Sequence, residues 1–107
     1  MAKKKLKGKL APVGIEMALK FRDDYVQCRL FAIDETRAVA EVTGGSPERL
    51  RVGSRVICMF DYLDESFEGP CTVLGIKDAA LQLRFSDLDE EQLFFVRSLM
   101  EELGSGD

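Results

Sequence analysis

Residues 71–103 read CTVLGIKDAALQLRFSDLDEEQLFFVRSLMEEL, and this stretch joins two kinds of periodicity. Cys71 to Lys77 and Ala80 to Phe85 are short β-prone runs on either side of Asp78-Ala79, a pattern typical of a tight β-hairpin. After this hairpin, apolar residues recur at helical spacing. The stretch therefore predicts a hairpin that runs into a helix.

The helix is predicted from about Asp87 to Leu103. Ser86 supplies a capping hydroxyl, the nearby acids suit the positive end of the helix dipole, and Gly104 follows as a stop. The apolar stripe consists of Leu88, Leu93, Val96, Met100 and Leu103, with Phe95 and Leu99 beside it. Such a stripe must be buried, and we expect the helix to lie across a barrel or to plug one of its mouths.

The chain upstream of this stretch alternates in the period of two that marks half-buried strands. Strands are predicted at residues 13–21, 25–33, 38–43 and 54–60. In the second of these, Val26, Cys28, Leu30 and Ala32 are expected on one face. Asp61 to Gly69, rich in acid and glycine, is predicted to be a loop. Six short strands joined by turns favour a small closed barrel or a sandwich, because closure hides sheet edges.

Composition limits the chain to one globular domain. The 107 residues are 46% hydrophobic and 32% charged, and none of their apolar runs approaches the roughly 20 residues that span a bilayer. The basic start lacks the apolar region of a signal peptide, so we expect a cytoplasmic protein without a membrane span. The expected organisation is a flexible basic segment (1–12), a folded domain (13–104) and a short tail (105–107).

Charge is distributed unevenly along the chain. Five of the fifteen Lys and Arg residues fall in the first nine positions: Lys3, Lys4, Lys5, Lys7 and Lys9. Without them, ten basic residues face nineteen acidic ones, a net charge of −9 that should repel nucleic acid. A small β-barrel that binds nucleic acid therefore stays only as a remote alternative, and no nucleic-acid partner is expected.

The residues needed for most catalytic and metal sites are missing. The sequence contains no His, the usual general base, and its three cysteines are widely spaced. Cys28, Cys58 and Cys71 all lie in apolar runs, which predicts buried reduced thiols rather than a zinc site. We therefore expect neither an enzyme, nor a metal, nor a cofactor.

Two segments resemble the PilZ family. Leu50 to Val56 is similar to the segment that opens the family's middle strand, and Leu81 to Phe85 followed by Asp87 to Glu91 is similar to its last strand running into its helix. The resemblance implies a mainly β fold, a six-stranded antiparallel barrel with one C-terminal α-helix. It also implies a function, the binding of the second messenger cyclic di-GMP.

The family binds this ligand through Arg-x-x-x-Arg before the first strand and Asp-x-Ser-x-x-Gly after the second. The best counterparts here are Lys5 and Lys9, then Asp34, Thr36 and Arg37. Lysine keeps the charge of arginine but loses its planar stacking surface. Val39 stands where the second motif has glycine. Its branched side chain should block the close approach of the ligand that glycine allows. The turn at 34–37 also fits a simpler interpretation, in which Asp34 and Thr36 satisfy their own backbone.

The resemblance therefore leads to two hypotheses. The first is a PilZ-like adaptor in cyclic di-GMP-linked regulation of motility, pili or exopolysaccharide, which works through a protein partner with weak or absent nucleotide binding. Its contact candidates are Tyr62 and Phe67 in the 61–69 segment and the exposed side of the last helix, although both aromatics also fit a place in the core. The second is a cyclic di-GMP receptor that uses Lys5, Lys9, Asp34, Thr36 and Arg37.

Overall fold

The computed structural model describes residues 11–45 and 47–104. Its strands are β1 (Ala11–Phe21), β2 (Asp24–Ile33), β3 (Arg37–Gly45), β4 (Arg55–Tyr62), β5 (Glu65–Lys77) and β6 (Ala80–Phe85). A short 3-10 helix, η2 (Pro47–Arg49), links β3 to β4. The chain ends in α1 (Glu90–Leu99), which continues as a π-helical turn, η3 (Met100–Gly104). The six strands and the final helix predicted from the sequence are confirmed.

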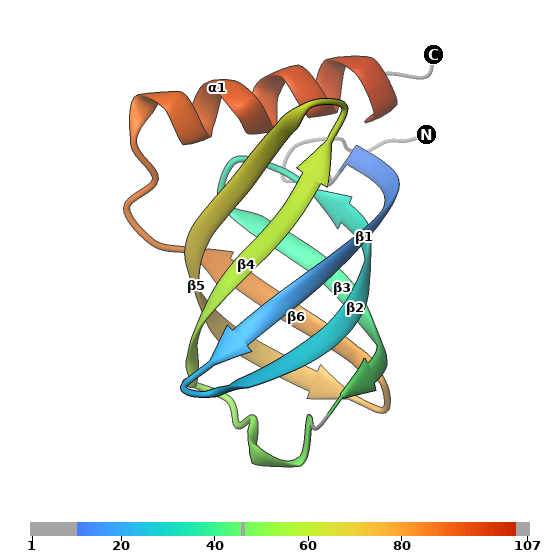
Figure 1. The fold of residues 1–107 in the computed structure, drawn as a ribbon, viewed down its shortest axis with the longest axis vertical. Coiled ribbons are helices and arrows are strands. Elements are labelled where there is room, and N and C mark those ends of the chain that lie inside the picture. Colours follow the sequence, from blue (N-terminus) through green and yellow to red (C-terminus); the bar gives the residue numbers. More distant parts are fainter. Residues whose placement is uncertain (1–10, 46, 105–107) are drawn as a thin grey trace, which may run out of the picture.

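The strands close into a barrel in the order β1-β2-β3-β6-β5-β4, with every neighbouring pair antiparallel. Closure gives each of the six strands a hydrogen-bonded neighbour on both sides, which limits edge-to-edge aggregation. Figure 1 shows the barrel with α1 lying across one end and the η2 connection at the other. No helix among the described residues is long and apolar enough to cross a membrane.

The hairpin turns are short and use left-handed backbone. Arg22 joins β1 to β2 with a φ of 59°, and Asp78 joins β5 to β6 with a φ of 56°. The third tight turn, at Leu63-Asp64, joins β4 to β5, and Leu63 has a φ of 57°. The predicted loop at 61–69 was therefore wrong, because Glu65 to Gly69 forms the first part of β5.

One strand changes its buried face partway along. Leu30 pairs with Ala40 of β3, but Ala32 pairs with Val39, so Phe31 is an extra residue in a β-bulge. The bulge moves Ile33 into the core and leaves Ala32 only half-buried. The predicted face of β2 was right up to Leu30 and wrong at Ala32 for this reason.

The helix begins three residues later than predicted. Asp87 has a left-handed φ of 52°, so the chain cannot turn helical there. Asp89, rather than Ser86, is the N-cap: its carboxylate accepts from the Gln92 amide N–H at 2.8 Å, and the Gln92 side chain accepts from the Asp89 amide N–H at 2.8 Å. Gln92 Nε2 also donates to the carbonyl oxygen of Glu68 at 2.6 Å. This capping box ties the start of α1 to β5.

The inner face of α1 closes the barrel end beneath it. Val96 and Leu99 are fully buried, and Phe95 joins an aromatic cluster with Phe60 and Phe67. The ring centroids of Phe60 and Phe67 lie 5.0 Å apart in a stacked arrangement, and Phe95 meets both at under 6 Å. The predicted placement of the helix across the barrel is confirmed.

All three cysteines are buried free thiols, as the sequence predicted. Burial raises the pKa of the Cys28 thiol to about 11. The pKa of Cys58 is also raised well above its usual value, first by a hydrogen bond with Cys71 and then by desolvation. The raised pKa keeps the Cys28 and Cys58 thiols protonated and inert at neutral pH. Within the described part of the chain, no group of acidic or cysteine side chains is arranged to hold a metal ion.

Candidate functional site

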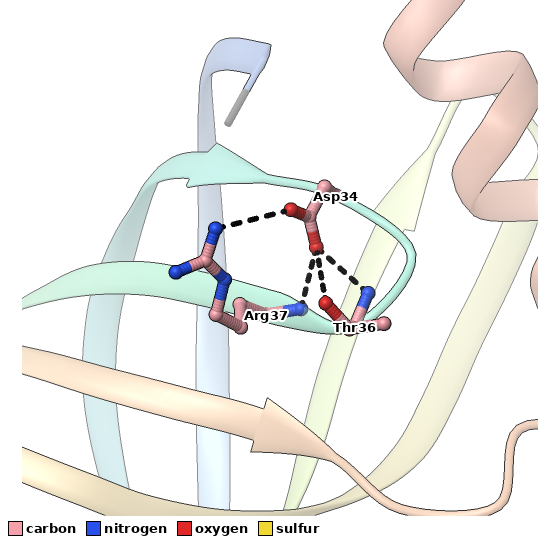
Figure 2. Close-up of polar contacts among 3 residues, drawn as sticks. All are labelled: Asp34, Thr36 and Arg37. Atoms are coloured by element: carbon pink, nitrogen blue, oxygen red, sulfur yellow. Dashed lines mark hydrogen bonds and ion pairs between the residues drawn. The ribbon is translucent and has the colours of Figure 1, made fainter. Parts of the chain in front are cut away.

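The turn between β2 and β3 holds three of the predicted ligand residues. Figure 2 shows Asp34 at its centre, with one carboxylate oxygen, Oδ1, accepting three hydrogen bonds. The donors are the Thr36 amide at 2.7 Å, the Thr36 hydroxyl at 3.0 Å and the Arg37 amide at 2.7 Å. The structure therefore brings Asp34, Thr36 and Arg37 together, but it turns their polar groups toward one another.

The second carboxylate oxygen of Asp34 is also occupied. Oδ2 lies 3.6 Å from Arg37 Nη2, and the Asp34 amide donates to the Arg37 carbonyl at 2.8 Å. Glu35, at the tip of the turn, pairs with Arg97 of α1 through its Oε2 and the Arg97 Nε. The simpler interpretation of this turn is confirmed for Asp34, whose carboxylate accepts from two backbone amides, whereas the Thr36 hydroxyl donates to that carboxylate instead of to the backbone.

Val39 lies on the outer face of the barrel. Its neighbours Ala38 and Ala40 are buried in the core, and the alternation of the strand sends the Val39 side chain outward. It pairs with Ala32 on β2 and Gln82 on β6, and it is half-buried among these strands. A branched side chain thus fills the outer surface two residues after Arg37.

Register places further arginines on this outer face that sequence reasoning missed. Arg37 on β3 lies opposite Arg84 on β6, Arg84 lies opposite Thr72 on β5, and Thr72 lies opposite Arg55 on β4. Directly opposite residues of antiparallel strands share a face. Arg84 and Arg55 are exposed, so the row brings positive charge beside the turn at Asp34. Arg55 and Arg84 lie in the two segments that resemble the PilZ family, but only strand pairing places them on the same face as Arg37.

The other two predicted ligand residues, Lys5 and Lys9, lie outside the described residues. The nearest described position is Ala11, which pairs with Ile33 at the end of β2. Because Ile33 directly precedes Asp34, Ala11 lies beside the start of the turn.

The two protein-contact candidates have different environments. Phe67 is 2% exposed and packs in the aromatic cluster, so it is not available as a surface anchor in this structure. Tyr62 is half-buried, and its hydroxyl donates to Glu102 Oε1 at 2.9 Å. This hydrogen bond raises the pKa of Tyr62. The bond connects the β4–β5 hairpin to η3 rather than leaving the phenol free for a partner.

A groove of about 1080 Å³ lies between the β4–β5 hairpin and α1. Two large apolar side chains on its walls are exposed, Leu63 at 76% and Phe94 at 70%. Nothing in the sequence distinguishes Leu63 within the predicted loop, whereas the position of Phe94 off the apolar stripe of the helix was a usable signal. These two residues, rather than Phe67, are the apolar side chains that the groove presents.

The geometry of the turn gives a testable stability prediction. Replacing Asp34 with alanine removes the acceptor for two amides and one hydroxyl, so we expect the free energy of unfolding to fall by about 1–2 kcal/mol. Asp34→Asn keeps an oxygen acceptor and should lose less than half as much. Urea unfolding followed by circular dichroism measures both, and equal losses would show that the charge, not the acceptor, stabilises the turn.

Comparison with known proteins identifies the fold. No sequence-family model matches the chain, and no curated protein sequence matches it. Solved structures do: the PilZ domain of YcgR from Escherichia coli, with c-di-GMP, has a TM-score of 0.75 at 14% identity, over 88% of this chain and 86% of that one. The PilZ domain of CeSA from a cellulose-synthesizing bacterium has a TM-score of 0.74 at 14% identity, over 90% of this chain and 98% of that one. The chain therefore has the PilZ-domain fold, a closed six-stranded antiparallel barrel followed by one C-terminal helix.

Proposed function

We propose that this chain is a PilZ-like signalling domain of the cytoplasm that works through contacts with a protein partner in cyclic di-GMP-linked regulation, with weak or absent binding of the nucleotide. The observation that carries the proposal is the closed turn at Asp34. Its carboxylate is held by three local donors and Arg37, and Val39 fills the surface where the ligand motif has glycine.

The weak affinity expected for cyclic di-GMP follows from the positions at which this chain differs from the ligand motifs of the family. Losing a buried bidentate or stacked contact costs about 1–3 kcal/mol at each site. Lysine at positions 5 and 9 cannot stack on a guanine as arginine does, and valine at 39 obstructs close approach. Two or three such losses take a micromolar ligand to about millimolar affinity or weaker.

The alternative is a cyclic di-GMP receptor with a non-standard site made of Lys5, Lys9, Asp34, Thr36 and Arg37. Two observations favour it. Arg84 lies opposite Arg37 and adds a second guanidinium beside the turn, and Ala11, the first described residue, pairs with Ile33 directly before Asp34. The solved PilZ domain of YcgR, which has the same fold, contains c-di-GMP.

A restored motif separates these two functions. The variant Lys5→Arg, Lys9→Arg, Thr36→Ser, Val39→Gly recreates both ligand motifs in the same barrel. We expect it to bind cyclic di-GMP at least a hundredfold more tightly than the unmodified chain, as measured by the concentration dependence of amide chemical shifts. A single Val39→Ala variant, which keeps strand backbone and removes only the branched atoms, is the matched control for β3.

Equal micromolar affinity in the restored and unmodified chains would contradict the proposal, because the changed residues would then not matter. Failure of both chains to bind would place the loss of affinity elsewhere on the barrel.

A further inference from the structure

The groove between the β4–β5 hairpin and α1 combines exposed apolar side chains with one sign of charge. Leu63 stands at the tip of the hairpin and Phe94 on the helix, and both line the groove. Large exposed apolar side chains gathered in one hollow are typical of a surface that another chain covers. The capping box at Asp89 and the Tyr62–Glu102 hydrogen bond hold the two walls in place.

The charged side chains of the lining, called the rim, are all acidic in this groove. Apart from the N-cap Asp89, six carboxylates line it: Asp64, Glu65 and Glu68 from the hairpin, and Glu90, Glu91 and Glu102 from the helical end of the chain. No Lys or Arg is among the described residues of the lining. The carboxylates of Glu65, Glu68 and Glu91 form no hydrogen bond or ion pair with any residue in 11–45 or 47–104. The groove therefore presents uncompensated negative charge around an apolar floor.

We propose that this groove binds a basic amphipathic segment of a partner protein, with apolar side chains against Leu63 and Phe94 and lysines or arginines above the rim. The inference rests on the proposed function, since it identifies the surface that such an adaptor uses. The charge of the groove decides the class of occupant. A nucleotide, a nucleic acid or an anionic lipid surface carries the same sign as the rim and is repelled.

The net charge of the described body argues against a second copy of the barrel as the occupant. Across residues 11–45 and 47–104, ten basic residues face eighteen acidic ones, so the body of another copy is itself acidic. A helical segment with one apolar face and flanking positive charges can pack against Leu63 and Phe94 and pair with the carboxylates of the rim. This is the arrangement of other helix-in-groove complexes.

The test uses a defined probe on the full chain. The probe is a fluorescein-labelled 14-residue peptide of leucine and lysine, arranged so that the leucines fall on one helical face. Anisotropy gives its dissociation constant, and amide shifts of the labelled protein locate it. We expect saturable binding with shifts confined to residues 61–68 and 89–102. A peptide with the same pattern of leucine and glutamate, and one of lysine and serine, should both bind at least tenfold more weakly.

Two variants with matched controls assign the contacts. Phe94→Ala should weaken the probe about tenfold or more, whereas Val52→Ala, at a 65% exposed apolar residue away from the groove, should leave binding unchanged. Glu65→Gln combined with Glu68→Gln should weaken binding and reduce its salt dependence, and Glu16→Gln on β1, which does not line the groove, serves as the charge control.

Several results would overturn the proposal. These are shifts that map outside the groove, affinity unchanged by Phe94→Ala, and equal affinity for the lysine–serine peptide, which would mean attraction by charge alone. A tenfold gain in probe affinity in the full-chain variant Lys3→Gln, Lys4→Gln, Lys5→Gln would also overturn it, because the chain's own basic segment would then be the occupant.

Titrating the same samples with cyclic di-GMP keeps the two proposals separate. Micromolar nucleotide binding contradicts the proposed function whatever the peptide does. Absent peptide binding together with absent nucleotide binding overturns the groove alone.

Discussion

Leu83→Ala is expected to lower the free energy of unfolding by about 3 kcal/mol, since the side chain is 0% exposed at the centre of the barrel. Leu83 lies on β6 and pairs with Ala38 of β3 and with Val73 of β5. Ala38 is small and both strands are fixed by hydrogen bonds on each side, so the neighbours cannot collapse into the space. The loss therefore includes the cavity as well as the removed methyl groups.

Leu74→Ala is the matched control, because it removes the same atoms from a leucine of β5 that is 42% exposed. We expect this change to cost under about 1 kcal/mol. Urea unfolding of both variants, fitted with a common slope, gives the comparison. Equal losses would mean that β6 does not face a packed core and would contradict the barrel.

Gly45→Ala is expected to cost about 3 kcal/mol, because this position requires glycine for two reasons. Its φ is 93°, a conformation that residues with a side chain rarely adopt. A Cβ there would also lie 2.6 Å from the Tyr25 carbonyl oxygen and 3.0 Å from the Val26 Cα, both in the backbone of β2. Backbone atoms cannot move aside as a side chain can, so the end of the β2–β3 pairing must separate.

Gly53→Ala separates these two causes. Gly53 has a φ of 97°, but a Cβ there would meet no atom within 4 Å. Its replacement should cost only the backbone strain, about 1 kcal/mol. Thermal and urea unfolding of the two variants should therefore differ by about 2 kcal/mol, and an equal effect would show that Gly45 does not pack closely against β2.

The strands were predictable wherever their alternation is local. The hairpin around Asp78 and the inward residues of β4 follow directly from the period of two. The first part of β5 was missed because Gly69 occupies a buried position and gives no hydrophobic signal. Glycine is needed there, since a Cβ would lie 2.7 Å from the ring of Phe67. The bulge at Phe31 was likewise invisible, because it depends on pairing with β3.

In the candidate site too, local features could be predicted from the sequence and features that depend on strand pairing could not. Asp34 and Thr36 are two residues apart, so their mutual hydrogen bonds follow from a turn that the sequence predicts. Arg84 is 47 positions from Arg37 in the sequence, and only the β3–β6 register brings them together. The groove needs the helix to be placed beside the hairpin, which no periodicity specifies. Contacts within a turn could be predicted, whereas the register between strands far apart in the sequence and the groove beside the helix could not.

Calorimetric titration of the full chain with cyclic di-GMP measures whether this barrel with the PilZ fold binds the nucleotide. With the Asp34 carboxylate bound within its own turn and Val39 on the surface, we predict no saturable heat up to millimolar ligand. A micromolar dissociation constant that Lys5→Ala or Lys9→Ala abolishes would contradict the account and establish the receptor instead.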